Sequence, residues 1–115
     1  MDERLEAIAK VLDQNKAERI EKFNLENSDY MVSGVVVASA LADRHLTALI
    51  DYLKEALKPI GEEFLHSDVS DEWAAIDLGD ILVHIMNEKT RDRYNLEAFL
   101  DEFKKRKSIA NKRDA

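Results

Sequence analysis

The sequence contains no cysteine, which excludes disulfide bonds, thiolate zinc sites and cysteine catalysis. It has one proline and three glycines, at positions 34, 61 and 79, and none of these lies in the spacing of a dinucleotide-binding or P-loop motif. The common phosphate cradles are therefore absent. Because no Ser/His/acid pattern and no metal-ligand spacing stands out, we expect no catalytic residue, no metal and no cofactor.

The sequence also lacks a long apolar run. Its first residues carry acids at once, and no segment is long and apolar enough for a signal peptide or a membrane span. This pattern predicts a cytoplasmic protein without membrane contact. The length of 115 residues fits one domain, large enough for a stable core without disulfide bonds or metals.

Charge is distributed unevenly along the chain. The formal net charge is −7, but residues 104–115 hold six basic side chains and one acid, which leaves 11 basic and 23 acidic side chains, a net of −12, in residues 1–103. An acidic body repels the phosphate backbone of nucleic acids and attracts basic proteins. We expect residues 1–103 to form the domain and residues 104–115 a flexible basic tail, the only segment expected to contact RNA.

Hydrophobic periodicity predicts an α+β fold with a mixed sheet and packed helices. Leu5, Ile8 and Leu12 recur at helical spacing, whereas the valines at 35–37 form an unbroken run typical of a strand covered on both faces. We expect that strand to be the sheet centre and residues 62–71 to form a polar loop. The order α-β-β-α-β-β-α-α comprises helices at residues 3–14, 41–58 and 87–93, a last helix capped by Asn95, and strands at residues 19–25, 31–38, 73–78 and 81–86.

Chemically distinctive residues concentrate in residues 71–100. Asp77 and Asp80 flank Gly79 between two predicted strands. Paired carboxylates near a strand end can bind magnesium, but Asp is also common in tight turns, where it bonds the backbone. We favour the turn, because no basic or glycine-rich phosphate site accompanies the pair.

His84 and Trp73 each have two interpretations. His84 could act as a general base oriented by an acid of the hairpin, but a histidine hydrogen-bonded within the sheet or packed at an interface is favoured. Trp73 is either a core residue or an interface anchor. The second role is typical of Trp, Tyr and Arg at binding hot spots, and Arg91 and Tyr94 lie close by in sequence.

The segment DEWAAIDLGDILVHIMNEKTRDRYNLEAFL, residues 71–100, closely resembles the signature of the ribosomal silencing factor family, also called Iojap-like or RsfS. That signature has a Trp, an apolar strand ending in Asp-hydrophobic-Gly-Asp, a Val-His-hydrophobic-hydrophobic strand, and then an Arg and Tyr-x-Leu-Glu. The resemblance runs from about Leu5 to Phe103, and residues 73–97 are its most specific part.

Upstream, the chain departs from the family pattern. The family has an Asp-Tyr pair where this chain has Ser33-Gly34, and a Gly-Thr-Ser-Ser-Arg-His segment of which only Arg44 and His45 remain in residues 40–45. The family fold is distantly nucleotidyltransferase-like, and the departures weaken an active-site interpretation. For His45 we favour a place at a helix terminus over contact with a partner.

The resemblance implies a translation repressor without catalysis. Such factors bind the large ribosomal subunit through large-subunit ribosomal protein fourteen and sterically prevent the small subunit from joining when nutrients are short. An acidic body suits a basic ribosomal protein, and exposed aromatic and arginine side chains would anchor it. We expect the partner-binding residues to be Trp73, Asp77, Leu78, Gly79, Asp80, His84, Met86, Arg91 and Tyr94.

Two other functions stay open. One is a nucleotidyltransferase-like, nucleotide-binding protein that holds magnesium at Asp77 and Asp80. The other is a dimeric adaptor. The resemblance allows a homodimer, which would use the same apolar patch in competition with the ribosome.

Overall fold

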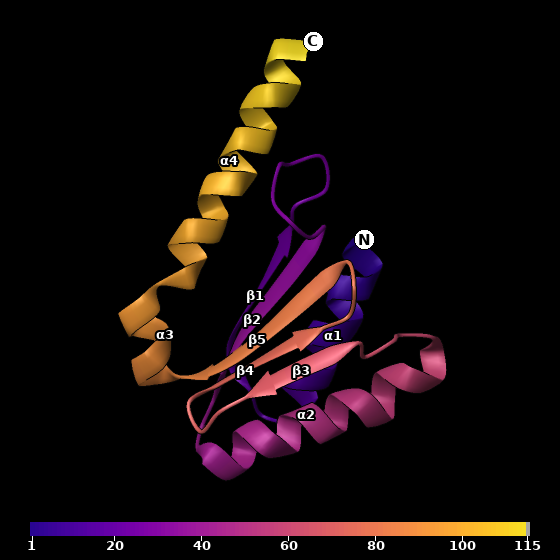
Figure 1. Cartoon of the computed structure of the whole chain (residues 1–115), viewed down its shortest axis with the longest axis vertical. Coiled ribbons are helices and arrows are strands. Elements are labelled where there is room, and N and C mark those ends of the chain that lie inside the picture. Colours follow the sequence, from indigo (N-terminus) through magenta and orange to yellow (C-terminus); the bar gives the residue numbers. More distant parts are fainter. Residues whose placement is uncertain (115) are drawn as a thin grey trace.

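The computed structural model describes the backbone of residues 1–114 and the side chains of residues 1–105. Its centre is a mixed sheet of five strands in the order β1-β2-β5-β4-β3 (Figure 1). β2 and β5 run parallel, and the other neighbouring pairs are antiparallel. The strands are β1 (Glu18–Asn24), β2 (Gly34–Ala40), β3 (His66–Val69), β4 (Trp73–Asp77) and β5 (Ile81–Asn87).

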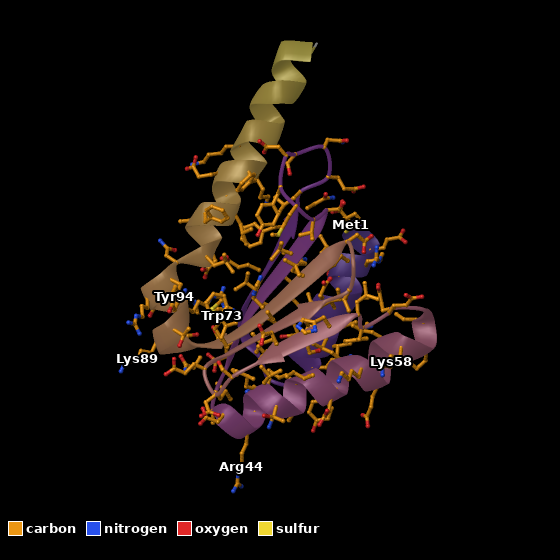
Figure 2. The ribbon with its side chains drawn as sticks, viewed as in Figure 1. Met1, Arg44, Lys58, Trp73, Lys89 and Tyr94 are labelled. Carbon is orange, nitrogen blue, oxygen red and sulfur yellow. The ribbon has the colours of Figure 1, made fainter. Side chains whose placement is uncertain are left out.

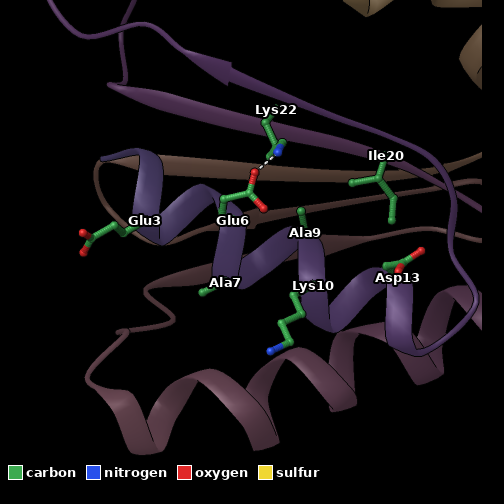
Figure 3. Close-up of a pocket in the computed structure, with 8 residues that line it drawn as sticks. All are labelled: Glu3, Glu6, Ala7, Ala9, Lys10, Asp13, Ile20 and Lys22. Carbon is green, nitrogen blue, oxygen red and sulfur yellow. Dashed lines mark hydrogen bonds and ion pairs between the residues drawn. The ribbon is translucent and has the colours of Figure 1, made fainter.

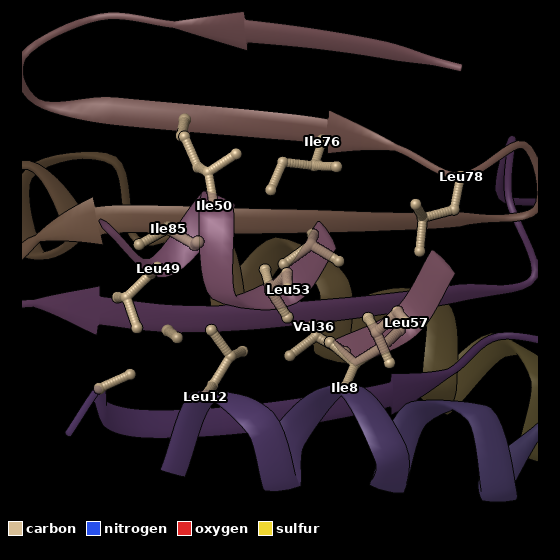
Figure 4. Packing of buried hydrophobic residues seen from close by; sticks show 14 of the residues in the cluster. Ile8, Leu12, Val36, Leu49, Ile50, Leu53, Leu57, Ile76, Leu78 and Ile85 are labelled. Carbon is tan, nitrogen blue, oxygen red and sulfur yellow. The ribbon is translucent and has the colours of Figure 1, made fainter. Parts of the chain in front are cut away.

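Two long helices cover one face of this sheet. In α1 (Asp2–Gln14) and α2 (Asp43–Leu57), the buried Leu and Ile residues recur every three or four positions, so each helix turns one apolar stripe toward the strands. Figure 4 shows Ile8 of α1 and Leu53 of α2 packed beside Val36 of β2. This layer of helix and strand side chains is the main hydrophobic core.

Tight turns fix the connections on this side of the fold. A short 3₁₀ helix, η1 (Lys58–Ile60), follows α2 and ends at Gly61, whose φ is +103°. Gly79, with φ +96°, occupies the hairpin between β4 and β5. Both glycines adopt a conformation that side chains with a Cβ rarely tolerate, and this explains why glycine stands at these two turns.

Two further helices lie across only part of the opposite face. α3 (Glu88–Tyr94) begins at Asn87, whose side chain accepts a hydrogen bond from the backbone of Thr90 at 2.8 Å. α4 (Leu96–Asp114) then runs past β1 and β2 and projects beyond the sheet (Figure 1). Its Leu100 completes a second, smaller core with Phe23, Leu25, Val35, Val37 and Met86.

Most of the expected elements are confirmed, and the α+β class with a mixed sheet is correct. The polar loop expected over residues 62–71 was wrong in part, because it contains the edge strand β3. The sheet centre is β5, although β2 is buried along its whole length as expected. Asn95 adopts a left-handed conformation that ends α3.

The expected boundary between a domain and a basic tail falls inside α4, whose backbone is helical through Asp114. The side chains of residues 106–115, which carry most of the basic charge of this segment, lie outside the described residues. Within the part of the chain that is described, no helix has an apolar stretch long enough to cross a membrane.

Truncation of Leu53 tests the helix-side core. We expect Leu53→Ala to lower the free energy of unfolding by about 2–5 kcal/mol, since this fully buried side chain would leave a cavity between α2 and the sheet. The measurement is urea denaturation followed by circular dichroism. Tyr52→Ala, at an exposed position of the same helix, is the control, and equal losses in the two variants would contradict the packing described.

Candidate functional site

The face of the sheet opposite α1 and α2 is uncovered over β3, β4 and part of β5. Directly paired residues in the register place Asp68, Ala75 and His84 in one row across these strands, and His66, Asp77 and Leu82 in the next. Alternate residues such as Ile76 and Val83 point into the helix-side core. We call the uncovered set the open sheet face: it comprises His66, Asp68, Trp73, Ala75, Asp77, Leu82 and His84.

An aromatic pair stands at the α3 end of the open sheet face. Trp73 of β4 and Tyr94 of α3 have ring centroids 5.1 Å apart, and Figure 2 shows the two side chains in the same corner of the molecule. Tyr94 is 57 % exposed and Trp73 is half-buried. An aromatic group that is neither fully buried nor fully solvated is typical of a protein-binding surface.

His84 fixes the position of the Trp73 indole ring through a hydrogen bond. The indole Nε1 of Trp73 donates a hydrogen bond to Nδ1 of His84 at 3.0 Å. Burial lowers the pKa of His84 to about 4, because the sheet disfavours the charged imidazolium. His84 is therefore neutral near pH 7, and the hydrogen-bonded role favoured from the sequence is confirmed.

The acids of the β4–β5 hairpin are bonded to groups other than His84. Asp77 accepts a hydrogen bond from the backbone N–H of Gly79 at 2.7 Å, which is the turn role expected for it. Asp80 is bound by Arg4, whose guanidinium also bonds Glu62 at 2.7 Å and 2.9 Å. The Arg4 guanidinium lowers the pKa of Asp80. In the described part of the chain, no three His, Asp or Glu side chains gather into a metal-binding group.

Three of the expected contact residues are buried, and for Leu78 and Arg91 the expectation of an exposed anchor was wrong. Leu78 is 5 % exposed and belongs to the helix-side core. Met86 lies between the sheet and α4, in the smaller core. Arg91 is 1 % exposed, and its side chain points inward from α3. Gly79 remains exposed at the hairpin tip.

Arg91 holds α3 and α4 against the sheet. Its guanidinium donates to Oγ of Ser39, a buried residue of β2, at 2.9 Å, and its Nε donates to the carboxylate of Glu97 in α4. Glu21 of β1 lies 3.8 Å from Nη2. A cation with this little exposure requires such partners, because desolvation of an unpaired charge is expensive. Arg91 therefore stabilises the packing of α3 and α4 on the sheet and is not exposed to a partner.

His45, which the family pattern retains, is also structural. Its Nδ1 accepts a hydrogen bond from the backbone N–H of Leu41 at 2.9 Å, and its Nε2 lies 2.8 Å from the carbonyl of Asn15. The ring therefore joins the end of α1 to the start of α2. This agrees with the favoured place at a helix terminus.

Another hollow lies between α1 and β1, with a volume of about 520 Å³ (Figure 3). Its lining mixes three acids, Glu3, Glu6 and Asp13, with the two lysines Lys10 and Lys22, and an ion pair between Lys22 and Glu6 crosses it. Because the two charge signs are mixed and partly paired, we do not assign the site to this hollow.

Four residues of the open sheet face, His66, Asp68, Ala75 and Leu82, were not among the expected contact residues. His66 and Asp68 lie in β3, which has only four residues, of which three are exposed. So short an edge strand shows almost no hydrophobic alternation. Pairing with β4 is what brings these side chains to the site.

Comparison with known proteins decides the family. The family model described as "Ribosomal silencing factor during starvation" matches residues 1–115. The chain belongs to the ribosomal silencing factor family. A protein named ribosomal silencing factor RsfS from Halalkalibacterium halodurans is 26 % identical over 97 residues, which cover 83 % of each chain. Its counterpart from Chromobacterium violaceum is 35 % identical over 66 residues, 56 % of this chain and 54 % of that protein.

Solved structures show the same fold within the family. A crystal structure of a Chromobacterium violaceum protein has a TM-score of 0.80 and 26 % identity, and the match covers 87 % of this chain and 85 % of that one. A mouse relative, 31 % identical over 61 % of this chain and 31 % of its own length, is named "Mitochondrial assembly of ribosomal large subunit protein 1". These names describe ribosome factors and not enzymes.

Removal of Arg91 tests the buried network. We expect Arg91→Ala to lower the free energy of unfolding by about 3–5 kcal/mol, because Glu97, with a side chain 14 % exposed, would lose its hydrogen-bonded cation and keep only Arg19 at 3.6 Å. Urea denaturation measures this loss, and Arg93→Ala, an exposed position in the same helix, is the control. The double change Arg91→Met with Glu97→Gln should restore part of the stability. A loss no larger than that of the control would show that the network is not stabilising.

The lowered pKa of His84 predicts a pH dependence of stability. Between pH 6.5 and pH 4 the unfolded chain binds a proton at this residue that the folded chain does not, so stability falls as the pH falls through this range. We expect this residue to account for about 2 kcal/mol of the loss between pH 7 and pH 5. Urea denaturation at both pH values should show a loss smaller by this amount in His84→Gln. His66→Gln should behave like the unchanged protein, and identical losses in all three would contradict the assignment.

Proposed function

We propose that this protein binds the large ribosomal subunit through its open sheet face and sterically prevents the small subunit from joining, which represses translation when nutrients are limited. The partner on the subunit is large-subunit ribosomal protein fourteen. The observation that carries the proposal is the half-buried Trp73, held beside the exposed Tyr94 on the only sheet face that the fold leaves uncovered among the described residues.

The geometry favours protein binding over catalysis. The imidazole of His84 is neutral and already bonded to Trp73, and the hairpin acids are occupied by a backbone N–H and by Arg4. These groups are thus not arranged as an acid and base around a cavity. A steric block needs no reacting group, only a rigid body bound at the place where the two subunits meet.

Charge supports a basic protein as the partner. Residues 1–103 carry more than twice as many acids as bases, and the open sheet face includes Asp68, with the exposed Asp71 and Glu72 in the adjoining β3–β4 turn. Such a surface repels phosphate and attracts Lys and Arg side chains, and this long-range attraction speeds association. Ribosomal RNA is then contacted, if at all, through the basic residues after 103.

Trp73→Ala tests the proposal. We expect the unchanged protein to co-sediment with isolated large subunits and to reduce their joining to small subunits. We expect the variant to bind at least tenfold more weakly, because buried aromatic anchors each contribute about 2 kcal/mol or more. Tyr52→Ala, an exposed aromatic position on α2, is the control.

Unhindered joining in the presence of the unchanged protein, with nothing co-sedimenting, would refute the proposal. Loss of self-association in Trp73→Ala, with ribosome binding intact, would instead indicate that the aromatic pair serves a dimeric adaptor. Sedimentation equilibrium of both proteins measures that alternative.

A further inference from the structure

A small pocket opens on the open sheet face, at the end of the β3–β4 hairpin. It has a volume of about 280 Å³ and is lined by Asp68, Ser70, Trp73 and Ala75. Asp68 and Ala75 are directly paired across β3 and β4, and Trp73 follows on the same face of β4. The pocket therefore places one carboxylate beside the indole ring.

The walls of this pocket are held rigidly. Ser70 donates its backbone N–H to the carbonyl of Trp73 at 2.9 Å, and the backbone N–H of Trp73 donates to Oγ of Ser70 at 3.2 Å. The indole itself is fixed by its hydrogen bond to His84. Because these groups are already ordered, the protein loses little conformational entropy when a ligand binds here, and this favours affinity.

The carboxylate of Asp68 differs from the acids at and beside the β4–β5 hairpin. Asp80 and Glu62 are bound by Arg4 and Asp77 by a backbone N–H, whereas Asp68 is exposed and makes no hydrogen bond or ion pair with any described side chain. Because burial keeps His84 uncharged near pH 7, this neighbour does not offset the negative charge.

A carboxylate next to an aromatic wall fits one side chain in particular. An arginine guanidinium is planar, stacks on an indole face, and donates two parallel hydrogen bonds to a carboxylate. A lysine ammonium offers neither the plane nor the fork, and a phosphate would be repelled. We infer that this pocket receives an arginine side chain of the basic protein that docks on the open sheet face.

This inference rests on the proposed function for the identity of the partner, but the pocket can be tested separately. The first experiment measures co-sedimentation of large subunits with the unchanged protein, Asp68→Asn and Glu55→Gln. Both variants lose one negative charge, and Glu55 is exposed on α2, away from the open sheet face. We expect Asp68→Asn to bind roughly tenfold more weakly and Glu55→Gln to change binding less than twofold, because a charge-assisted hydrogen bond is lost only in the first.

Equal binding of all three proteins to the large subunit would overturn the inference about the pocket and leave the proposed function in place. Equal weakening in both variants would also overturn it, since that would reflect net charge alone. The urea midpoint of Asp68→Asn, expected to match that of the unchanged protein, verifies that the variant is folded.

The second experiment needs no ribosome, because Trp73 is the only tryptophan in the chain and its fluorescence reports directly on the pocket. The probe is the capped peptide acetyl-Gly-Arg-Gly-amide, with the uncharged citrulline peptide as its match. We expect the arginine peptide to change the fluorescence saturably in the unchanged protein and in Glu55→Gln, and at least fivefold more weakly in Asp68→Asn. The same response to both peptides, or an unaltered response in Asp68→Asn, would overturn the inference even if the protein bound no subunit.

Discussion

The buried guanidinium of Arg91 is the constraint on which the candidate site depends. A cation with 1 % exposure has to be neutralised locally, and its partners come from β2 and α4, so α3 is fixed between the sheet and the last helix. Tyr94 lies three residues further along α3 and is thereby held against Trp73. The same contact keeps α4 over β1 and β2, which leaves β3 and β4 uncovered.

The helices fully cover only one face of the sheet, and this determines which side chains a binding partner can contact. α1 and α2 together bury the helix side of all the central strands, whereas the opposite side receives only the first part of α4. An antiparallel sheet edge can face solvent in this way, but a parallel pair such as β2 and β5 is usually covered on both sides. The covered portion comprises β1, β2 and the end of β5 at Met86, and the open portion comprises the antiparallel strands β3 and β4 with Leu82 and His84 of β5.

Local patterns could be predicted from the sequence, but the pairing of distant charges could not. The helical spacing of Leu5, Ile8 and Leu12 and the turn at Gly79 depend on neighbours in the chain, and both predictions agree with the structure. Arg91 was expected to be an exposed anchor, yet it is buried and bonded to Ser39, which lies 52 positions away. Asp80 was expected to serve the turn and to contact a partner, but it is bound by Arg4, which lies 76 positions away. No periodicity encodes such contacts.

In this chain, the carboxylates that stabilise the fold are paired with arginines of the same chain, and those available for binding a partner are not. Acids that brace the fold, such as Asp80 and Glu97, have an arginine of the same chain beside them, and any partner would have to displace it. Acids at the β3–β4 end have no such competitor among the described side chains, so the free energy of a new ion pair there is not reduced by the loss of an old one. A protein that docks on this face therefore gains most at Asp68 and beside Trp73, and least at the hairpin carboxylates that the sequence alone singles out.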